Sequence, residues 1–444
     1  MILSSVNLFC LVHFILCLPY LSVFVTGESK KCHSLSGDIK YYLGTKTPYS
    51  YVANVDDDPI VYDGCTPIRI WALIRHGTRN PGKISEKIRV HLSALKMILI
   101  DRHESGKGNL CEEEVERLRT WEPTVDPTEL KFLTHEGEEE MLLLGERFLN
   151  RFPDLLPESY SNKTYKFRHT ATQRTRESSQ FFTVGLFGRR QKAYVWYPEP
   201  LAKDPILRFY KLCKRWRVEV DKNEDALTEL DKFKSRPIVS RMLDNISARI
   251  GLNNRIKFED AKLIYQTCAF ETAWHPKSPS PWCALFSKDD MEILEYSEDL
   301  KYFWIDGYGY PLTYEQACVA VNDMFHHLTD ESYPPYTFYF SHSGTMLKVL
   351  SHLGLYQDPH PLSADLFNKT RLWRTSTIDV FGSNLAFVLY SCPDGYKVLT
   401  LHQERPVTLP GCPDDDLCPL DLLQEVYRES IENCDFDQYC HLDT

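Results

Sequence analysis

The chain has 444 residues, a formal net charge of −11 at neutral pH, and 25% charged residues. This length allows a large core, arranged as one large domain with an insertion or as two domains. The acidic balance argues against a nucleic-acid partner, but a small anion can still bind where cationic side chains gather locally.

Residues 1–27 are apolar, with no Asp, Glu, Lys or Arg before Glu28. The small residues Val25-Thr26-Gly27 offer a cleavage site, so the segment is interpreted as a secretory signal. An uncleaved membrane anchor is the alternative, because the apolar run is nearly long enough to span a bilayer. We expect a protein secreted via the endoplasmic reticulum; retention in the lumen of that compartment or anchoring at the cell surface is the alternative.

Cysteine usage agrees with export. The chain has 14 cysteines, and removing Cys10 and Cys17 with the signal leaves an even number that can pair in an oxidising compartment. No spacing among them fits a zinc site, so we expect disulfides, no metal and no other cofactor. Several cysteines crowd the end of the chain, where we expect them to hold the tail in place: Cys392, Cys412, Cys418, Cys434 and Cys440.

Three Asn-x-Ser/Thr triplets are candidate glycosylation sites in the same compartment. They begin at Asn162, Asn245 and Asn368. Each triplet alone is a weak signal, because such triplets also occur by chance.

The first strong structural signal is a buried strand over residues 68–74 (IRIWALI), which leads directly into Arg75-His76-Gly77-Thr78-Arg79-Asn80-Pro81. Ligands of open α/β sheets bind at the carboxyl ends of the strands. Arg75 and Arg79 flank His76, and guanidinium groups suit phosphate oxygens. They also disfavour protonation of the imidazole, which leaves a ring nitrogen free to attack phosphorus. The motif therefore predicts a phosphate site with a histidine nucleophile; the alternative is an exposed basic turn.

Pro81 fits the start of a helix predicted over residues 83–100. Thr134 is placed as the N-cap of a further amphipathic helix. A short strand over residues 164–167 then ends in Arg168 and continues toward a helix that contains Phe182. An arginine at this strand end is expected to face the same phosphate, but Arg168 or Arg174 can equally cap a helix or pair with carboxylates.

The strand signal returns at residues 336–340 (YTFYF), followed by His342 and a helix predicted over 346–355. This order repeats the arrangement of the first motif and places His342 near a helix N-terminus, which favours anions. A lone histidine there is more often structural. The last strands are predicted at 385–390 and 398–401.

Residues 188–325 contain basic clusters and helical patterns with few strand-like runs. We interpret this segment as a mostly helical insertion that covers one side of the sheet. The core is then predicted to comprise residues 28–187 and 326–444, after a signal at 1–27.

These motifs resemble the histidine acid phosphatases. The RHGxRxP pattern is matched from Arg75 to Pro81, and the helix start of the family by Leu133, Thr134 and Gly137. The resemblance implies an α/β fold with a mixed central sheet flanked by helices and a mostly helical cap. It implies that His76 and His342 are catalytic, and that Arg75, Arg79 and Arg168 bind the substrate.

Within that superfamily, the insertion is most similar to the phytase-like branch of multiple inositol polyphosphate phosphatases. The matching stretches are Ser280-Pro281-Trp282-Cys283, Leu294-Glu295-Tyr296, Asp299-Leu300-Lys301 and Gly307-Tyr308-Gly309-Tyr310. The branch implies a small polyanionic substrate: inositol hexakis-, pentakis- or tetrakisphosphate, with 2,3-bisphosphoglycerate as a further candidate.

The chain departs from that branch after His342, where Ser343-Gly344 replaces the usual Ala-Glu. The missing carboxylate is the proton donor to the leaving alcohol, and general acid catalysis typically contributes about 10²–10⁴-fold. A carboxylate from the cap or from the helix after Thr134 is expected to replace it if turnover is kept. If turnover is weak or lost, the chain is a secreted polyphosphate-binding protein. A broad-specificity acid phosphatase is the third hypothesis. For any of the three, we expect membrane association only if the N-terminal segment stays uncleaved.

Overall fold

The computed structural model describes residues 32–35 and 39–442. Residues His33–Thr444 form one compact unit, and Met1–Cys32 are assigned to another. The predicted signal, residues 1–27, lies outside the described residues. Among the helices of the described part, none is both long and apolar enough to cross a membrane.

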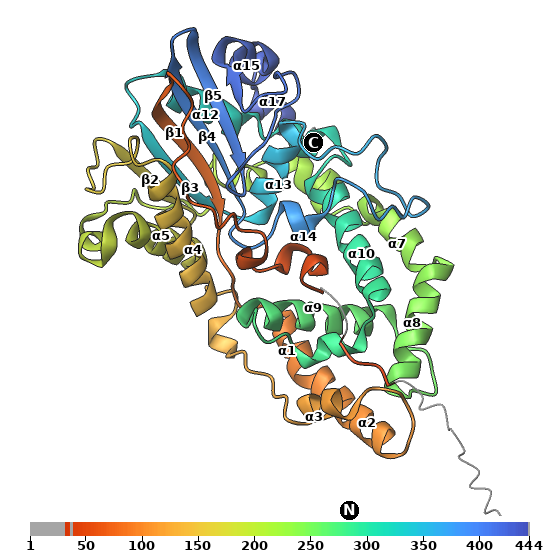
Figure 1. The fold of residues 1–444 in the computed structure, drawn as a ribbon. Coiled ribbons are helices and arrows are strands. Elements are labelled where there is room, and N and C mark those ends of the chain that lie inside the picture. The colour runs from red at the N-terminus through yellow and green to blue at the C-terminus, as the bar shows by residue number, and fades with distance from the viewer. Residues whose placement is uncertain (1–31, 36–38, 443–444) are drawn as a thin grey trace, which may run out of the picture. The chain divides into compact units, whose positions relative to one another are not determined.

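Seven strands of the described residues form one sheet in the larger unit (Figure 1). The strand order is β2-β3-β1-β4-β5-β6, and β7 pairs with β5. Strand β1 is parallel to β3 and antiparallel to β4, so the predicted mixed sheet is confirmed. The strands are Thr66–Arg75 (β1), Tyr165–His169 (β2), Tyr336–Ser341 (β3), Asn384–Cys392 (β4), Gly395–His402 (β5), Arg405–Pro406 (β6) and Leu417–Pro419 (β7).

The helices account for the rest of the regular structure. The helix predicted over 83–100 is divided into α1, a π-helical turn at Ile88–Leu92, and α2. The α-helices of the described residues are Ile84–Lys87 (α1), Ser93–Glu104 (α2), Glu112–Arg119 (α3), His135–Arg151 (α4), Gln173–Gln191 (α5), Lys214–Trp216 (α6), Thr228–Lys234 (α7), Pro237–Ile250 (α8), Phe258–Trp274 (α9), Lys288–Asp306 (α10), Pro311–Glu315 (α11), Cys318–Thr329 (α12), Ser343–His352 (α13), Thr375–Ile378 (α14), Leu420–Val426 (α15), Arg428–Glu432 (α16) and Phe436–Cys440 (α17).

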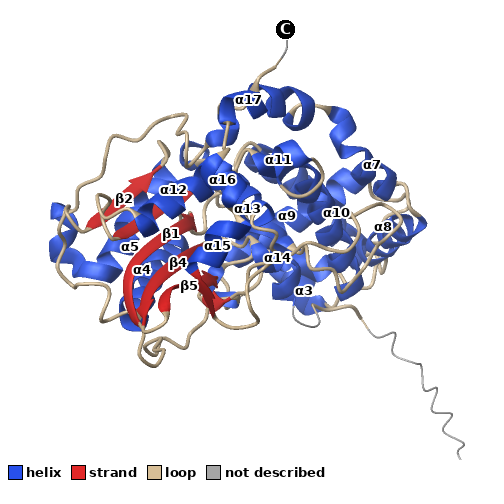
Figure 2. Cartoon of the chain, turned by 90° about the horizontal axis from the view of Figure 1, so that it is seen from above, coloured by secondary structure: helices blue, strands red, loops and turns tan. Residues whose placement is uncertain are grey.

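Different helices cover the two faces of the sheet (Figure 2). Helices α4 and α5 cover one face, where Phe148 and Phe182 pack against Phe338 of β3. Helices α12 and α13 cover the other face, and Val321 and Leu350 lie in that core. Strand β1 is therefore buried on both sides, which explains why residues 68–74 form an almost continuous apolar run.

A third core, away from the sheet, is built by helices alone. It contains buried residues of α2, α3, α8, α9 and α10, among them Leu99, Val115 and Ile246. Within the described residues, the segment 188–325 holds helices and no strand. Helices α2 and α3 precede that segment yet share its core, so two separate parts of the chain build the helical region. The domain boundaries drawn from the sequence stay a prediction.

Disulfides hold distant segments together, as predicted from the cysteine pattern. Each of the cysteines expected to secure the tail is paired, and the bonds join Cys65 to Cys392, Cys213 to Cys440, Cys268 to Cys283, Cys318 to Cys434, and Cys412 to Cys418.

Candidate active site

The loop after β1 brings His76 to the carboxyl edge of the sheet. The backbone N–H of His76 donates to the carbonyl oxygen of Ser341 at the end of β3 over 3.1 Å, and the N–H of Gly382 donates to the carbonyl oxygen of His76 over 3.1 Å. His76 is thus held between the end of β3 and the turn that precedes β4, the two strands that flank β1. This is the edge at which open α/β sheets bind ligands.

The loop then packs directly against the first turn of α4. The N–H of Thr134 donates to the carbonyl oxygen of Thr78 over 2.9 Å. A Cβ atom on Gly77 would lie 2.5 Å from the carbonyl oxygen of Gly137, and one on Gly137 would lie 2.2 Å from that of Thr78. Both glycines are therefore required by the close approach of two backbones.

Glu140 of α4 holds the same loop from behind. Its carboxylate accepts from the N–H of Thr78 over 2.7 Å, from the hydroxyl of Thr78 over 2.9 Å and from the N–H of Tyr49 over 2.7 Å. Burial raises the pKa of Glu140 to about 7, although these hydrogen bonds oppose the shift. Glu140 is thus a positioning residue, because it contacts the loop and not the ring of His76.

His76 has the geometry of a nucleophile. Its Nδ1–H donates to the carbonyl oxygen of Gly77 over 2.9 Å, because a carbonyl can only accept, and this leaves the lone pair on Nε2. Burial holds the pKa of His76 well below 6.5, and the charges of Arg174, Arg75 and Arg79 lower it further. The imidazole is therefore neutral and able to attack an electrophile.

His342 lies opposite His76, with the two ring centroids 5.6 Å apart. Arg174 Nη2 lies 3.2 Å from Nδ1 of His342, and a guanidinium only donates, so Nδ1 accepts. The Nε2–H of His342 consequently donates to the hydroxyl oxygen of Thr170 over 2.9 Å. Burial and the charge of Arg174 lower the pKa of His342 well below 6.5. The structure thus brings both predicted histidines together.

Arg75 and Arg79 both lie close to the ring of Phe381. Their guanidinium carbons lie 4.9 Å and 6.0 Å from the centroid of that ring. Arg75 is fixed by Asp379, with Nη1 3.5 Å from Oδ1, and by the carbonyl oxygen of Thr45 over 2.9 Å. Burial, Arg174 and Arg75 lower the pKa of Arg79 to about 9. Both predicted arginines of the motif therefore belong to the site.

The structure does not bring Arg168 to this site. Arg168 lies within β2, and its Nη2 pairs with Asp204 Oδ2 over 2.5 Å. Successive strand residues point to opposite faces; Phe167 faces α4 and α5, so Arg168 faces the other side, where it lies 5.3 Å from the ring of Tyr339. The predicted role of Arg168 is corrected: Arg174, in the first turn of α5, occupies that place.

Sequence reasoning also missed the breadth of the positive cluster. The pKa of Arg174 is lowered to about 10 by burial, Arg208 and Arg75. The pKa of Lys131 is lowered by partial burial and by Arg174 and Arg79. Within the described part of the chain, no Asp or Glu forms an ion pair with Arg79, Arg174 or Arg208. These cations raise one another's free energy until an anion binds among them.

Ser343 and Gly344 follow His342 in the first turn of α13. The hydroxyl of Ser343 donates to Asp379 Oδ2. Burial raises the pKa of Asp379 to about 6, and Arg75 and Ser343 oppose that shift. Asp379 therefore links Ser343 to Arg75 beneath the site.

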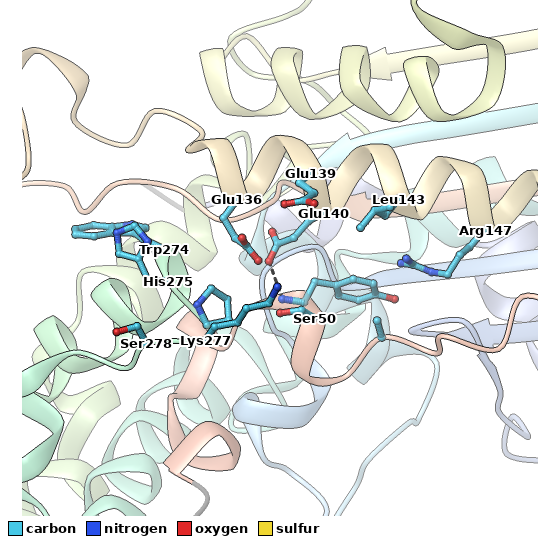
Figure 3. A pocket seen from close by; sticks show the side chains of 13 residues that line it. Ser50, Glu136, Glu139, Glu140, Leu143, Arg147, Trp274, His275, Lys277 and Ser278 are labelled. Carbon is cyan, nitrogen blue, oxygen red and sulfur yellow. Dashed lines mark hydrogen bonds between the residues drawn. The ribbon is translucent and has the colours of Figure 1, made fainter. Parts of the chain in front are cut away.

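A separate cavity lies on the far side of Glu140. It has a volume of about 500 Å³, and neither His76 nor His342 lines it. Figure 3 shows Glu136 and Glu139 of α4 on one side of this cavity and Lys277 and Trp274 on the other. Its three glutamates disfavour a phosphate, so the anion site is the arginine cluster around the histidines and not this cavity.

The three candidate glycosylation sites are exposed. Asn162, Asn245 and Asn368 are all open to solvent on the surface of the unit. Their exposure is compatible with glycosylation, which stays a prediction. In the described residues, no group of three or more His, Cys, Asp or Glu side chains is arranged to hold a metal ion.

A sequence model described as histidine phosphatase superfamily (branch 2) matches residues 69–405. The chain is 31% identical over 411 residues to multiple inositol polyphosphate phosphatase 1 of Drosophila melanogaster, covering 89% of this chain and 86% of that protein. It is 28% identical over 446 residues to the Homo sapiens protein of the same name, covering 92% and 90%.

Two solved structures share the fold. The phytase from D. castellii matches with a TM-score of 0.76 at 18% identity, covering 92% of this chain and 93% of that one. The Bifidobacterium longum multiple inositol polyphosphate phosphatase, in complex with inositol hexasulfate, matches with a TM-score of 0.65 at 15% identity, covering 87% and 97%.

Proposed function

The chain belongs to branch 2 of the histidine phosphatase superfamily and is a histidine-type phosphatase, and we propose that it hydrolyses inositol polyphosphates through a phosphohistidine at His76. The proposed substrates are inositol hexakis-, pentakis- and tetrakisphosphate, with 2,3-bisphosphoglycerate as a further one. The names of its relatives support this substrate class.

One observation carries the proposal: a neutral His76 with a free Nε2 lies among arginines of which Arg79 and Arg174 form no ion pair with a carboxylate of the described residues. Burial and the neighbouring arginines keep the imidazole unprotonated. The same arginines can neutralise the oxygens of a phosphoryl group. A protein that only binds polyphosphate needs the cations but not the oriented nucleophile.

The reaction proceeds in two steps. Nε2 of His76 attacks phosphorus while Arg75, Arg79 and Arg174 stabilise the charge on the equatorial oxygens, and the bond to the leaving oxygen breaks. Water then attacks the phosphohistidine, the bond between phosphorus and Nε2 breaks, and inorganic phosphate leaves. The ring of His342 lies opposite His76 in the site, and hydrogen bonds with Thr170 and Arg174 hold it in place.

Additional cations support a polyphosphate over a simple monoester. Arg208 lowers the pKa values of His342 and Arg174. Arg174 and Arg79 in turn lower the pKa of Lys131. A single phosphate group does not need all these positive charges. Several phosphates on one ring would neutralise them together, which distinguishes the proposal from a broad-specificity acid phosphatase.

The test is phosphate release from inositol hexakisphosphate by the purified chain, in the presence of a chelator, with His76→Ala alongside. We expect turnover that survives chelation and disappears in the variant. Comparison with 4-nitrophenyl phosphate, with and without Arg208→Ala, tests the substrate class: the variant should raise KM for inositol hexakisphosphate only. Tight binding of inositol hexakisphosphate without release would favour the binding-protein alternative.

We further propose secretion, supported by the disulfides between distant cysteines and by the exposed Asn-x-Ser/Thr triplets. Expression in a secretory host should deliver the protein to the medium with glycans on Asn162, Asn245 or Asn368. Retention of the protein in the cell, or the absence of glycans from all three asparagines, would contradict the proposed secretion.

A further inference from the structure

The proposed first step leaves one requirement open. An alkoxide of an inositol ring is a strongly basic leaving group, so it needs a proton as its bond to phosphorus breaks. The residues after His342 do not supply a carboxyl, because they are Ser343 and Gly344. A proton donor has to come from another element that reaches the mouth of the site.

Gly344 shows which element this is. A Cβ atom built on Gly344 would lie 3.2 Å from Oδ1 of Asp306 and 3.4 Å from the ring of Tyr210. Asp306 is the last residue of α10. Its carboxylate thus takes the space that a side chain at position 344 would enter, two residues after His342.

The charges around Asp306 connect it to the same site. Its negative charge acts on Tyr210 and on Asp379. Tyr210 in turn lies within the electrostatic reach of Arg174 and Arg208, which surround His342. Asp306 therefore lies within the electrostatic reach of the groups around the arginine cluster, although α10 starts far from the catalytic loops in the chain.

The other carboxylates near the site are less accessible. Asp379 has a side-chain exposure of 0% and is occupied by Arg75 and Ser343. Glu140 lies behind the loop and accepts from Thr78. The side chain of Asp306, by contrast, is 15% exposed, so a bound ester can contact it.

Lys348 holds the carboxylate of Asp306 in place. Its Nζ forms an ion pair with Oδ1 of Asp306, and its side chain is fully buried. The ammonium lies 4.2 Å from the ring centroid of Trp216 and 4.9 Å from that of Tyr210. Burial lowers the pKa of Lys348, and Asp306 opposes this shift. Lys348 is thus a positioning residue that orients the carboxylate from below.

We propose that Asp306 is the proton donor to the leaving alcohol and that the absence of a side chain at Gly344 keeps its place free. The inference rests on the proposed function. In the first step, the P–O bond breaks, the P–N bond to His76 forms, and the proton that Asp306 shares with the ammonium of Lys348 moves to the departing oxygen. In the second step, the carboxylate of Asp306 takes a proton from the attacking water, the P–N bond breaks, and inorganic phosphate leaves with the shared proton restored.

The test compares leaving groups. In Asp306→Asn, kcat/KM for inositol hexakisphosphate should fall about 10²-fold or more, whereas kcat/KM for 4-nitrophenyl phosphate, whose phenolate leaves without a proton, should fall less than about tenfold. Because kcat/KM covers the steps up to phosphoryl transfer, this difference isolates the protonation of the leaving group. Asp365→Asn is the matched control, because Asp365 forms an ion pair with Arg236 that is exposed to solvent. This control variant should leave kcat/KM for both esters unchanged.

Two further variants keep the test decisive. Asp306→Asn leaves Lys348 buried without its partner. The double variant Asp306→Asn/Lys348→Met removes both charges, and it replaces the single variant in the comparison of the two esters if the single variant does not fold. Adding Gly344→Glu to Asp306→Asn should restore part of the lost rate by supplying a carboxylate from α13.

Several results would overturn the inference. Equal losses for both esters, or no loss in a folded variant, would show that Asp306 does not protonate the leaving group. A loss confined to inositol hexakisphosphate in Asp379→Asn, with Asp306→Asn unaffected, would assign the role to Asp379. If the parent releases no phosphate from either ester, the proposed function fails and this inference fails with it.

Discussion

Arg168 and Arg174 are six residues apart, and their replacement by Ala is expected to have opposite effects. Arg174 contacts His342 in the site, whereas Arg168 pairs with Asp204 outside it. Arg174→Ala should therefore lower activity and leave stability intact. Arg168→Ala should lower stability and leave activity intact.

The magnitude for Arg174 follows from the hydrogen bonds that it can donate to phosphate. A hydrogen bond to a charged group contributes about 1.5–3 kcal/mol, so two of them correspond to about 3–6 kcal/mol, or roughly 10²–10⁴-fold in kcat/KM. The positive charge of Arg174 does not stabilise the folded state, because burial and Arg208 lower its pKa to about 10. Removing it should leave the free energy of unfolding unchanged or slightly higher.

The magnitude for Arg168 follows from the partner that it would leave behind. Asp204 is buried, with a side-chain exposure of 3%, and removing the cation of a buried pair costs about 3 kcal/mol or more. Two backbone N–H groups, of Ile206 and Leu207, still donate to the other oxygen of Asp204 and reduce that cost. The free energy of unfolding should fall by a few kcal/mol.

The assay measures both quantities on each variant: kcat/KM for inositol hexakisphosphate, and the free energy of unfolding from denaturant titration. Arg168→Ala should keep kcat/KM within about threefold of the parent. The reasoning is refuted if Arg168→Ala loses activity by about 10²-fold while remaining folded, or if Arg174→Ala stays fully active.

Three other variants or conditions give independent tests. Gly137→Ala would place a Cβ 2.2 Å from the carbonyl oxygen of Thr78, so it should displace the loop and lower both kcat and, by about 1–3 kcal/mol, the free energy of unfolding; unchanged kinetics would contradict the backbone contact. Because the pKa of His76 is held well below 6.5 by burial and arginines, the neutral nucleophile persists as pH falls, and kcat/KM corrected for substrate ionisation should not decrease when the pH is lowered through 6.5; a decrease with a midpoint there would show an ordinary imidazole. Gly344→Glu in the parent should not raise the rate on inositol hexakisphosphate, because Asp306 already supplies the proton; a large gain would mean that the parent lacks a proton donor.

The fold could be predicted from the sequence where strands alternate with helices. The apolar runs at 68–74 and 336–340 are β1 and β3, and Thr134 caps α4 as expected, with its hydroxyl accepting from the N–H of Gly137. The local pattern is sufficient there because burial on both faces leaves only apolar residues in the central strands.

The alternation of buried residues in β2 is a local signal against a role of Arg168 in the site. Tyr165, Phe167 and His169 form one face of β2, and their alternation places Arg168 on the opposite face from them. Arg174 lies beyond the strand end, in the first turn of the next helix, where a side chain can turn toward the ligand edge.

The sequence predicts a carboxylate from the cap or from the helix after Thr134 as the proton donor, but it does not identify Asp306. Asp306 ends α10, 38 residues before Gly344. Its position depends on how α10 packs against α13, and no local pattern contains that information.

The central claim is that His76 carries the phosphoryl group. The most direct measurement is to mix the protein with inositol hexakisphosphate, quench in alkali, where phosphohistidine survives, and locate the modification by mass spectrometry of peptides, with His76→Ala in parallel. We predict phosphate on the peptide that contains His76 in the parent, and neither modification nor phosphate release in the variant. Phosphate release that continues in His76→Ala would contradict the account.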